Sequence, residues 1–168
     1  MNYKIRWAEK QDANSLGKIH TKSWQVAYQG IIPAEILDNI DVEERIKRFK
    51  KAIQENQEET AVLLANNKVV GFITLGENRD DDFGADTGEI WGIYLHPDYY
   101  RMGLGTELIK WGIEELSKRG YKKITLWVLK DNISSRKFYV KNGFVFDGTE
   151  GEIKKGKVLK KVRYLYNI

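Results

Sequence analysis

The stretch Tyr100–Thr106 combines residue types and spacing that are suited to binding an anion. It holds Gly103 and Gly105, follows an apolar run that ends at Leu95, and precedes an amphipathic pattern that begins near Leu104. A strand, a glycine turn and a helix start direct unpaired backbone N–H groups and the helix dipole toward one point. The pattern therefore predicts a phosphate site. The alternative is a plain chain reversal in which the glycines only avoid a Cβ clash.

Composition excludes several kinds of catalytic site. The 168 residues contain no Cys and two His, so a thiol nucleophile and a Cys-based metal site are excluded, and His20 and His96 alone cannot form a zinc cluster. The start of the sequence lacks the apolar core of a signal peptide, and no apolar run approaches the roughly 18 residues that span a membrane. We expect a soluble, cytoplasmic protein without a metal, with one domain over residues 1–168.

Charge is distributed unevenly along the chain. Residues 1–84 hold 12 Lys and Arg against 14 Asp and Glu, whereas residues 85–168 hold 16 against 10. The basic half contains the glycine turn and favours an acidic ligand, while the run Asp80–Asp82 in the acidic half favours a cationic one. The alternative is that both are ordinary solvated surface.

An aromatic ridge is expected on the first helix. Asp12 can cap this helix, and its apolar positions between residues 13 and 27 recur at helical spacing. His20, Trp24 and Tyr28 follow one another at intervals of four residues, so they stack on one flank and can project into a cleft. Ordinary packing is the alternative.

The other elements of the N-terminal half read as strands and one more helix. A helix is expected from Asp41, where Asp41 and Glu44 form a capping-box pattern. Gly92 lies inside an expected strand, where glycine often marks a bulge or the close approach of a ligand. The expected strands cover residues 3–7, a hairpin of 61–65 and 69–75 closed by residues 66–68, and, after an acidic loop at 79–86, residues 89–95.

The C-terminal half places the glycine turn at the end of a strand. A helix from Leu104 to near Gly120 and a strand over 123–129 complete a crossover that should be parallel and right-handed. The turn then lies at the carboxyl edge of the sheet, where open α/β sheets bind ligands. A short helix over 133–142 and a hairpin through 154–157 follow. The final strand, 158–166, alternates apolar and basic residues, which predicts an edge strand that pairs in a homodimer.

These motifs resemble those of the GNAT acetyltransferase superfamily. Tyr100 to Gly105 aligns with its acetyl-CoA motif, usually Gln/Arg-x-x-Gly-x-Gly/Ala, except that Tyr100 occupies the Gln/Arg position and Arg101 comes one place later. Asn132, Ser135, Phe138-Tyr139 and Gly143-Phe144 match a second family pattern in order and spacing. The resemblance covers nearly the whole chain, because residues 5–13 and 24–33 also look like many bacterial members.

The resemblance implies a fold and a cofactor site. The implied fold is mixed α/β, with a central, mostly antiparallel sheet of about seven strands, splayed between strands 4 and 5 and flanked by about four helices. Acetyl-CoA is implied as cosubstrate, with pantetheine in the split, the pyrophosphate at residues 101–106, and the backbone of Ile93 and Leu95 as hydrogen-bond partners of pantetheine and the acetyl carbonyl. The implied cofactor-binding residues are Ile93, Tyr94, Leu95, Tyr100, Arg101, Met102, Gly103, Leu104, Gly105, Thr106, Asn132 and Ser135.

The implied reaction is direct attack of an amine on the acetyl thioester, which agrees with the absence of Cys. Tyr139 occupies the place of the family's general acid, which protonates or hydrogen-bonds the departing thiolate; a packed aromatic is the alternative. Glu89 is the candidate base, acting through water, and a solvated charge at the strand edge is its alternative. His20 and Asp80–Asp82 are further candidates for the base. Asn132 can also cap its own helix.

The acceptor is the least determined part of the site. Trp24 and Tyr28 are its candidate walls, and an aromatic pair with nearby acids favours amines such as polyamines, amino-acid derivatives, aminoglycosides or a peptide terminus. Two other functions stay open: a non-catalytic sensor of acyl-CoA, and a nucleic-acid-binding surface formed by Phe144, Phe146, Tyr164 and Tyr166 among the lysines of the basic half.

Overall fold

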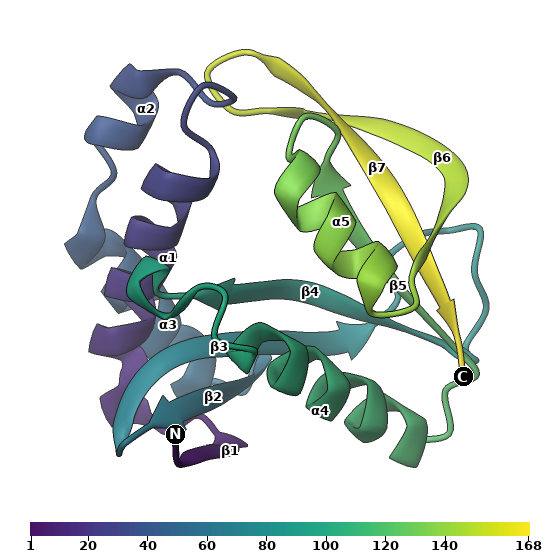
Figure 1. The fold of residues 1–168 in the computed structure, drawn as a ribbon, viewed down its shortest axis with the longest axis horizontal. Coiled ribbons are helices and arrows are strands. Elements are labelled where there is room, and N and C mark those ends of the chain that lie inside the picture. The colour runs from purple at the N-terminus through teal and green to yellow at the C-terminus, as the bar shows by residue number, and fades with distance from the viewer.

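A computed structural model describes residues 1–168 (Figure 1). Five α-helices and seven strands make up the fold, which confirms the predicted mixed α/β class. The strands are β1 (Tyr3–Trp7), β2 (Glu59–Ala65), β3 (Lys68–Glu77), β4 (Thr87–Leu95), β5 (Lys123–Leu129), β6 (Val145–Lys154) and β7 (Val158–Asn167). The helices are α1 (Ala13–Ala27), α2 (Ala34–Asp38), α3 (Val42–Gln54), α4 (Leu104–Lys118) and α5 (Ile133–Lys141), with 3₁₀ turns at Lys10–Asp12 and Pro97–Tyr99.

The seven strands form one sheet in the order β1-β2-β3-β4-β5-β7-β6. Every pair is antiparallel except β4 and β5, which are parallel as the crossover through α4 requires. The prediction that residues 158–166 form an edge strand is wrong, because β7 lies between β5 and β6. Its alternation has another cause: Val162 and Tyr164 pack in the core on one face, whereas Arg163 on the other face is buried against Asp80, Asp82 and Asp147. The homodimer inferred from an exposed β7 therefore loses its basis.

Two local expectations about helices are corrected. The carboxylate of Asp12 does not cap α1; it accepts hydrogen bonds from Arg6 and from the backbone N–H of Glu9 instead. The short helix α2 was not expected, because five residues are too few to show a helical repeat. Asp41, in contrast, caps α3 as predicted, since its side chain accepts from the N–H of Glu44 at 3.0 Å.

The β2–β3 and β3–β4 pairs confirm the predicted turn and bulge. Asn66 and Asn67 close the first hairpin with φ of 49° and 66°, in the left-handed region that Asn tolerates. In the second pair the register moves from Thr74 opposite Gly92 to Leu75 opposite Ile90, so β4 carries one extra residue there. The bulge lies next to Gly92 as expected.

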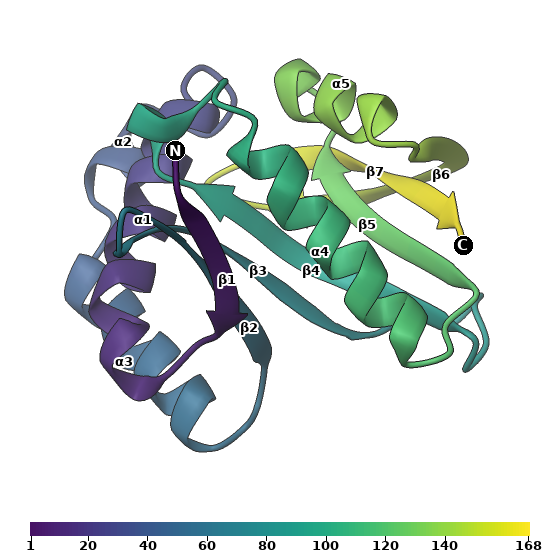
Figure 2. The same ribbon diagram turned by 60° about the horizontal axis from the view of Figure 1, so that its bottom comes forward.

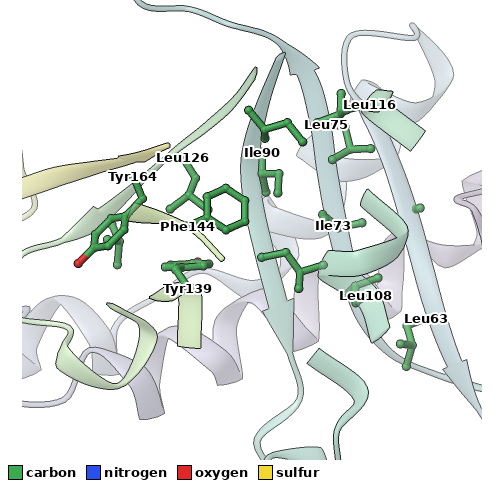
Figure 3. Packing of buried hydrophobic residues seen from close by; sticks show 14 of the residues in the cluster. Leu63, Ile73, Leu75, Ile90, Leu108, Leu116, Leu126, Tyr139, Phe144 and Tyr164 are labelled. Atoms are coloured by element: carbon green, nitrogen blue, oxygen red, sulfur yellow. The ribbon is translucent and has the colours of Figure 1, made fainter. Parts of the chain in front are cut away.

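Helices cover both faces of the sheet. Helix α4 lies across one face of β3 and β4, and α1 and α3 lie on the opposite face (Figure 2). The largest apolar cluster lies beneath α4 and α5 and includes Leu63, Ile73, Leu108, Phe144 and Tyr164 (Figure 3). Buried Phe144 and Tyr164, exposed by 1% and 3%, cannot stack on nucleic-acid bases, which removes half of the aromatic surface expected for that alternative.

Candidate active site

The parallel strands β4 and β5 separate after three paired positions. Thr87 to Glu89 pair with Lys123 to Thr125, and beyond that point the two strands diverge like the arms of a V (Figure 1). Because β5 leaves, the edge of β4 that faces it keeps backbone N–H and C=O groups without a strand partner. The predicted splay between strands 4 and 5 is confirmed.

Hydrogen-bond alternation identifies which residues of β4 face this gap. The N–H of His96 donates to the carbonyl of Val70 at 2.7 Å, so the backbone groups of Tyr94 and Gly92, two and four residues earlier, also point toward β3. Ile93 and Leu95 are the intervening residues, and their N–H and C=O groups point toward the gap. This placement supports the pantetheine contacts expected of both residues.

A cavity of about 1270 Å³ fills the gap and continues past it on both sides. At one end lie the glycine turn and α5, and at the other lie the ridge of α1 and the β6–β7 hairpin. Of the predicted site residues, it is lined by Trp24, Tyr28, Glu89, Ile93, Tyr94, Leu95, Tyr100, Arg101, Gly103, Gly105, Thr106, Asn132, Ser135 and Tyr139. The cavity thus brings together residues from both halves of the chain.

Two residues of the predicted cofactor set do not line the cavity with their side chains. Met102 is exposed by 54% at the surface of the turn, and Leu104 is buried in the core beneath α4. Any contact of these two residues with the cofactor is therefore limited to their backbone groups. Tyr100, the departure from the family motif, places its hydroxyl 3.4 Å from Ser23 Oγ and so joins the turn to α1.

The glycine turn has the backbone form of an anion cradle. Arg101 and Gly103 both adopt left-handed conformations, with φ of 62° and 81°. No side chain caps α4 at Gly103, so the first N–H groups of this helix are not satisfied by a capping group. Gly105 faces the cavity in the first turn of α4, and a Cβ there would meet only the ring of Phe138 at an ordinary 3.5 Å. The turn therefore fits a pyrophosphate group.

Helix α5 forms the wall opposite the turn. Asn132 caps it, since its Oδ1 accepts from the N–H of Ser135 at 3.3 Å, which confirms the capping alternative. Lys137 and Lys141, one turn apart on α5, also line the cavity and were missed from the sequence. Their spacing of four residues from each other was the available signal, because it places both on one helix face.

Tyr139 lies in the aromatic part of the core, and its residue borders the cavity. Its ring centroid is 6.2 Å from that of Phe144 and 6.3 Å from that of Tyr164. Burial raises the pKa of Tyr139, with a smaller contribution from Tyr94. The phenol therefore keeps its proton at neutral pH and is a hydrogen-bond donor rather than a strong acid.

Glu89 lies where the two strands begin to separate, and 1% of its side chain is exposed. The alternative to a catalytic role, a solvated charge at the strand edge, is therefore wrong. Its carboxylate accepts from the backbone N–H of Arg79 and from Arg79 Nε, both at 3.0 Å, and forms an ion pair with the same guanidinium. Arg79 in turn lies 4.4 Å above the ring of Trp91. A strong internal partner thus holds this carboxylate in place.

His20 is poorly suited to act as a base. Its Nδ1 lies 2.9 Å from Nη1 of Arg45, and because a guanidinium can only donate, Nδ1 must be the acceptor and the ring neutral. Burial, together with the positive charges of Arg45, Arg48 and Lys155, lowers the pKa of His20 to about 3. The ring packs between Trp24 and Tyr94, at 5.4 Å and 4.7 Å.

The acidic loop is also engaged within the protein. Asp80 and Asp82, together with Asp147, form ion pairs with Arg163, whose side chain is 5% exposed. Asp80 additionally accepts from Trp127 Nε1 at 3.0 Å. The expectation that this run attracts a cationic ligand is not supported, because its two paired carboxylates neutralise a buried arginine.

The aromatic ridge lines the cavity at the end away from the glycine turn. Trp24 and Tyr28 meet edge to face at 5.1 Å. Lys155 Nζ lies 5.3 Å above the Trp24 ring, and Lys155 and Lys161 of the last hairpin line the cavity as well. Sequence reasoning missed both lysines, because nothing local connects the hairpin to a helix more than 100 residues earlier.

Two kinds of feature are absent from the structure. No group of three or more His, Cys, Asp or Glu is placed to hold a metal ion. None of the helices is both long enough and apolar enough to cross a membrane.

Comparison with known proteins agrees with this geometry. The model of the acetyltransferase (GNAT) family matches residues 21–144. An uncharacterized N-acetyltransferase, YuaI of Bacillus subtilis, is 31% identical over 134 residues, covering 77% of this chain and 73% of the relative. A spermidine N(1)-acetyltransferase of Thermoplasma acidophilum is 27% identical over 156 residues, covering 90% of this chain and 93% of the relative.

Solved structures share the fold over the full length. The crystal structure of the PaiA N-acetyltransferase of Thermoplasma acidophilum in complex with coenzyme A has a TM-score of 0.78 at 23% identity and covers 100% of both chains. An N-acetyltransferase of Staphylococcus aureus Mu50 has a TM-score of 0.74 at 25% identity and covers 99% of both. From its splayed sheet, its glycine turn and these relatives, the chain belongs to the GNAT acetyltransferase family and is an acetyl-CoA-dependent N-acetyltransferase.

Proposed function

We propose that residues 1–168 act as a single catalytic domain that transfers the acetyl group of acetyl-CoA directly to a primary amine of a small molecule or peptide in the cytoplasm. One observation carries this proposal: a single cavity runs from the glycine turn through the splay to Trp24 and Tyr28. Both substrates can occupy it together, as a ternary complex requires. A chain without Cys is also consistent with direct transfer.

The residues at the glycine-turn end of the cavity would hold acetyl-CoA. The N–H groups of residues 101–106 face the pyrophosphate, the gap-facing backbone of Ile93 and Leu95 binds pantetheine and the acetyl carbonyl, and Asn132 and Ser135 lie along the opposite wall. Acetyl-CoA, when bound, supplies the activated acetyl thioester. A Thermoplasma acidophilum N-acetyltransferase of the same fold has been solved in complex with coenzyme A, which supports binding of this cosubstrate.

The acceptor amine must lose a proton before it can attack. A lysine-like amine has a pKa of about 10.4, so freeing it at pH 7 costs roughly 4.6 kcal/mol. Glu89 and Asp80 are the carboxylates that line the cavity, and an arginine pairs with each. The partner of Glu89, Arg79, is 55% exposed, whereas Asp80 is held by buried Arg163 and also accepts from Trp127. We therefore assign proton removal to Glu89 acting through water, with Arg79 fixing the orientation of its carboxylate.

The departing thiolate needs a hydrogen-bond donor. Tyr139 is the candidate, because it borders the cavity on α5 and its raised pKa keeps the hydroxyl protonated. Full proton transfer to a thiolate whose usual pKa is about 8.5 would be uphill. Tyr139 therefore acts by stabilising the thiolate through a hydrogen bond rather than by giving up its proton.

The proposal is tested with two measurements on the full chain. Acetyl-CoA at low micromolar concentration should raise the melting temperature, and a panel of primary amines should cause release of free CoA thiol. Binding of acetyl-CoA with no thiol release from any amine would instead identify a sensor. Salt-dependent binding of random oligonucleotides without stabilisation by acetyl-CoA would identify the nucleic-acid alternative.

A further inference from the structure

The end of the cavity away from the glycine turn is closed by the last hairpin. We call it the acceptor end and define it by Trp24, Tyr28, Ile153, Lys155 and Lys161. The tip of the β6–β7 hairpin reaches the segment between α1 and α2 (Figure 1), and Ile153 and Leu159 pack in one small cluster with Ile32 of that segment and Leu37 of α2. The hairpin therefore brings its side chains to the place where the amine must bind.

The charge that remains unpaired at this end is positive. Both lysines line the cavity, Lys161 from β7, where it is opposite Gly151, and Lys155 from the turn that follows β6. Neither forms an ion pair; Lys155 Nζ lies 5.3 Å from the centre of the Trp24 ring and Lys161 Nζ lies 4.2 Å from that of Trp127.

The carboxylates that line the cavity do not offset these lysines. Only Glu89 and Asp80 line it, and each is already engaged by an arginine, Arg79 and Arg163 respectively. Glu89 also receives two hydrogen bonds from Arg79 beyond the ion pair. A cationic ligand would therefore meet two free ammonium groups and no free carboxylate.

One hydrogen-bond donor at the acceptor end also lacks an acceptor. Trp24 Nε1 is buried and has no hydrogen-bond partner in the protein, which is rare for an indole N–H. Burial raises the pKa of Tyr28 well above its usual value, and the neighbouring Tyr94 hydroxyl adds to the shift, so this phenol stays protonated. A ligand that brings oxygen acceptors would complete this end of the site.

We propose that the acceptor is a small amine that also carries an anionic oxygen group, a carboxylate or a phosphonate, and that Lys155, beside Trp24, binds this group with support from Lys161. The inference rests on the proposed function and names its substrate class. It removes polyamines, which carry only positive charge, from the amines that the sequence left open, although one relative is a spermidine N(1)-acetyltransferase.

The same positive surroundings assist the chemistry. Burial lowers the pKa of the nearby His20 ring, and the positive charges of Arg45, Arg48 and Lys155 lower it further, so these cations create a positive potential on this side of the cavity. An amine bound there is subject to the same potential, which favours its neutral, nucleophilic form. A site that binds an anionic group with cations thus also helps the amine to lose its proton.

The test compares amines that differ only in the anionic group. L-phenylalanine is paired with phenethylamine, and L-methionine with 3-(methylthio)propylamine; 1-aminoethylphosphonate and spermidine complete the panel. We expect kcat/KM for thiol release to be at least roughly tenfold higher for the carboxylate member of a pair, as for a hydrogen bond to a charged group. Lys155→Met should abolish that preference by lowering only the carboxylate value. Lys157→Met, an exposed lysine of the same hairpin outside the cavity, should leave it unchanged.

Failure of this inference is distinguishable from failure of the proposed function. Equal rates within each pair, or highest activity with spermidine, would overturn the anionic acceptor while leaving the acetyltransferase intact. If no amine releases thiol, the same pairs are titrated calorimetrically into the CoA-saturated protein. Tighter binding of the carboxylate member, lost in Lys155→Met, then supports the inference, and equal or absent binding overturns it.

Discussion

Replacing Tyr139 by Phe removes one hydroxyl from the cavity wall and leaves the surrounding packing in place. The ring contacts with Phe138, Phe144 and Tyr164, at centroid distances of 5.5, 6.2 and 6.3 Å, do not depend on the hydroxyl. No hydrogen bond of that hydroxyl contributes to its raised pKa. We therefore expect Tyr139→Phe to fold with a free energy of unfolding within about 1 kcal/mol of the parent.

The expected loss of activity follows from one hydrogen bond to a developing charge. Such bonds contribute about 1.5–3 kcal/mol, which corresponds to roughly 10- to 150-fold in kcat. Affinity for acetyl-CoA should change little, because the thiolate exists only after the acetyl group has left. Since burial raises the pKa of Tyr139, its ionisation should not reduce the activity of the parent anywhere below the usual phenol pKa of about 10.

Steady-state thiol release and the acetyl-CoA-induced shift in melting temperature measure the two effects separately. Tyr164→Phe is the matched control: Tyr164 lies in the same aromatic group, but its hydroxyl accepts from Arg136 Nε at 3.0 Å and it does not line the cavity. The control should keep kcat within about twofold of the parent, as expected for a change outside the reacting groups. Unchanged kcat in Tyr139→Phe, or an equal loss in both variants, would refute the assigned role.

Four further outcomes are expected. Glu89→Gln should move the rise of activity to higher pH, because the amine must then lose its proton to solvent; a pH profile identical to that of the parent would point to another base. Gly105→Ala should keep or raise the melting temperature, since the added Cβ meets only Phe138 at 3.5 Å. The same variant should bind acetyl-CoA more weakly in calorimetry, and undiminished affinity would place the pyrophosphate elsewhere. Arg163→Met leaves Asp80, Asp82 and Asp147 without their shared cation and should lower the free energy of unfolding in urea by about 3 kcal/mol, whereas exposed Lys160→Met should not. Burial acts to raise the pKa of Asp12, but hydrogen bonds from Arg6 and the Glu9 N–H more than offset it, so the folded-state pKa is lowered. The stability that this carboxylate contributes is present above its unfolded pKa of about 3.9 and is lost as pH falls through the lower folded value. Asp12→Asn should therefore lose less stability than the parent between pH 6 and pH 3.

Local pattern was sufficient for most of the architecture. Period-two and period-3.6 repeats report which face of a segment is apolar, so the strands, α1, α3 and α4 were predictable. The capping residue Asp41 also reports where α3 begins. The chain reversal at Asn66-Asn67 and the bulge beside Gly92 were also predictable, because both depend on backbone freedom that the residue types reveal. Helix α2 is too short to repeat and was missed.

The strand order could not be derived in the same way. Alternation along residues 158–166 indicates one buried face, and a central strand and an edge strand share that signature. Only the pairing of β7 with both β5 and β6 shows that it lies inside the sheet. The dimer prediction failed for this reason.

The sequence alone determined the family, the cosubstrate and the glycine turn that suits a pyrophosphate, since these depend on residues close together in the chain. Only the tertiary structure decided which charges remain free. Arg163 reaches Asp80 across 83 residues and pairs with it, whereas Lys155 arrives beside Trp24 without a carboxylate. The physical reason is that charge pairing depends on distance in space, which the path of the folded chain sets, whereas periodicity reports only neighbours along it.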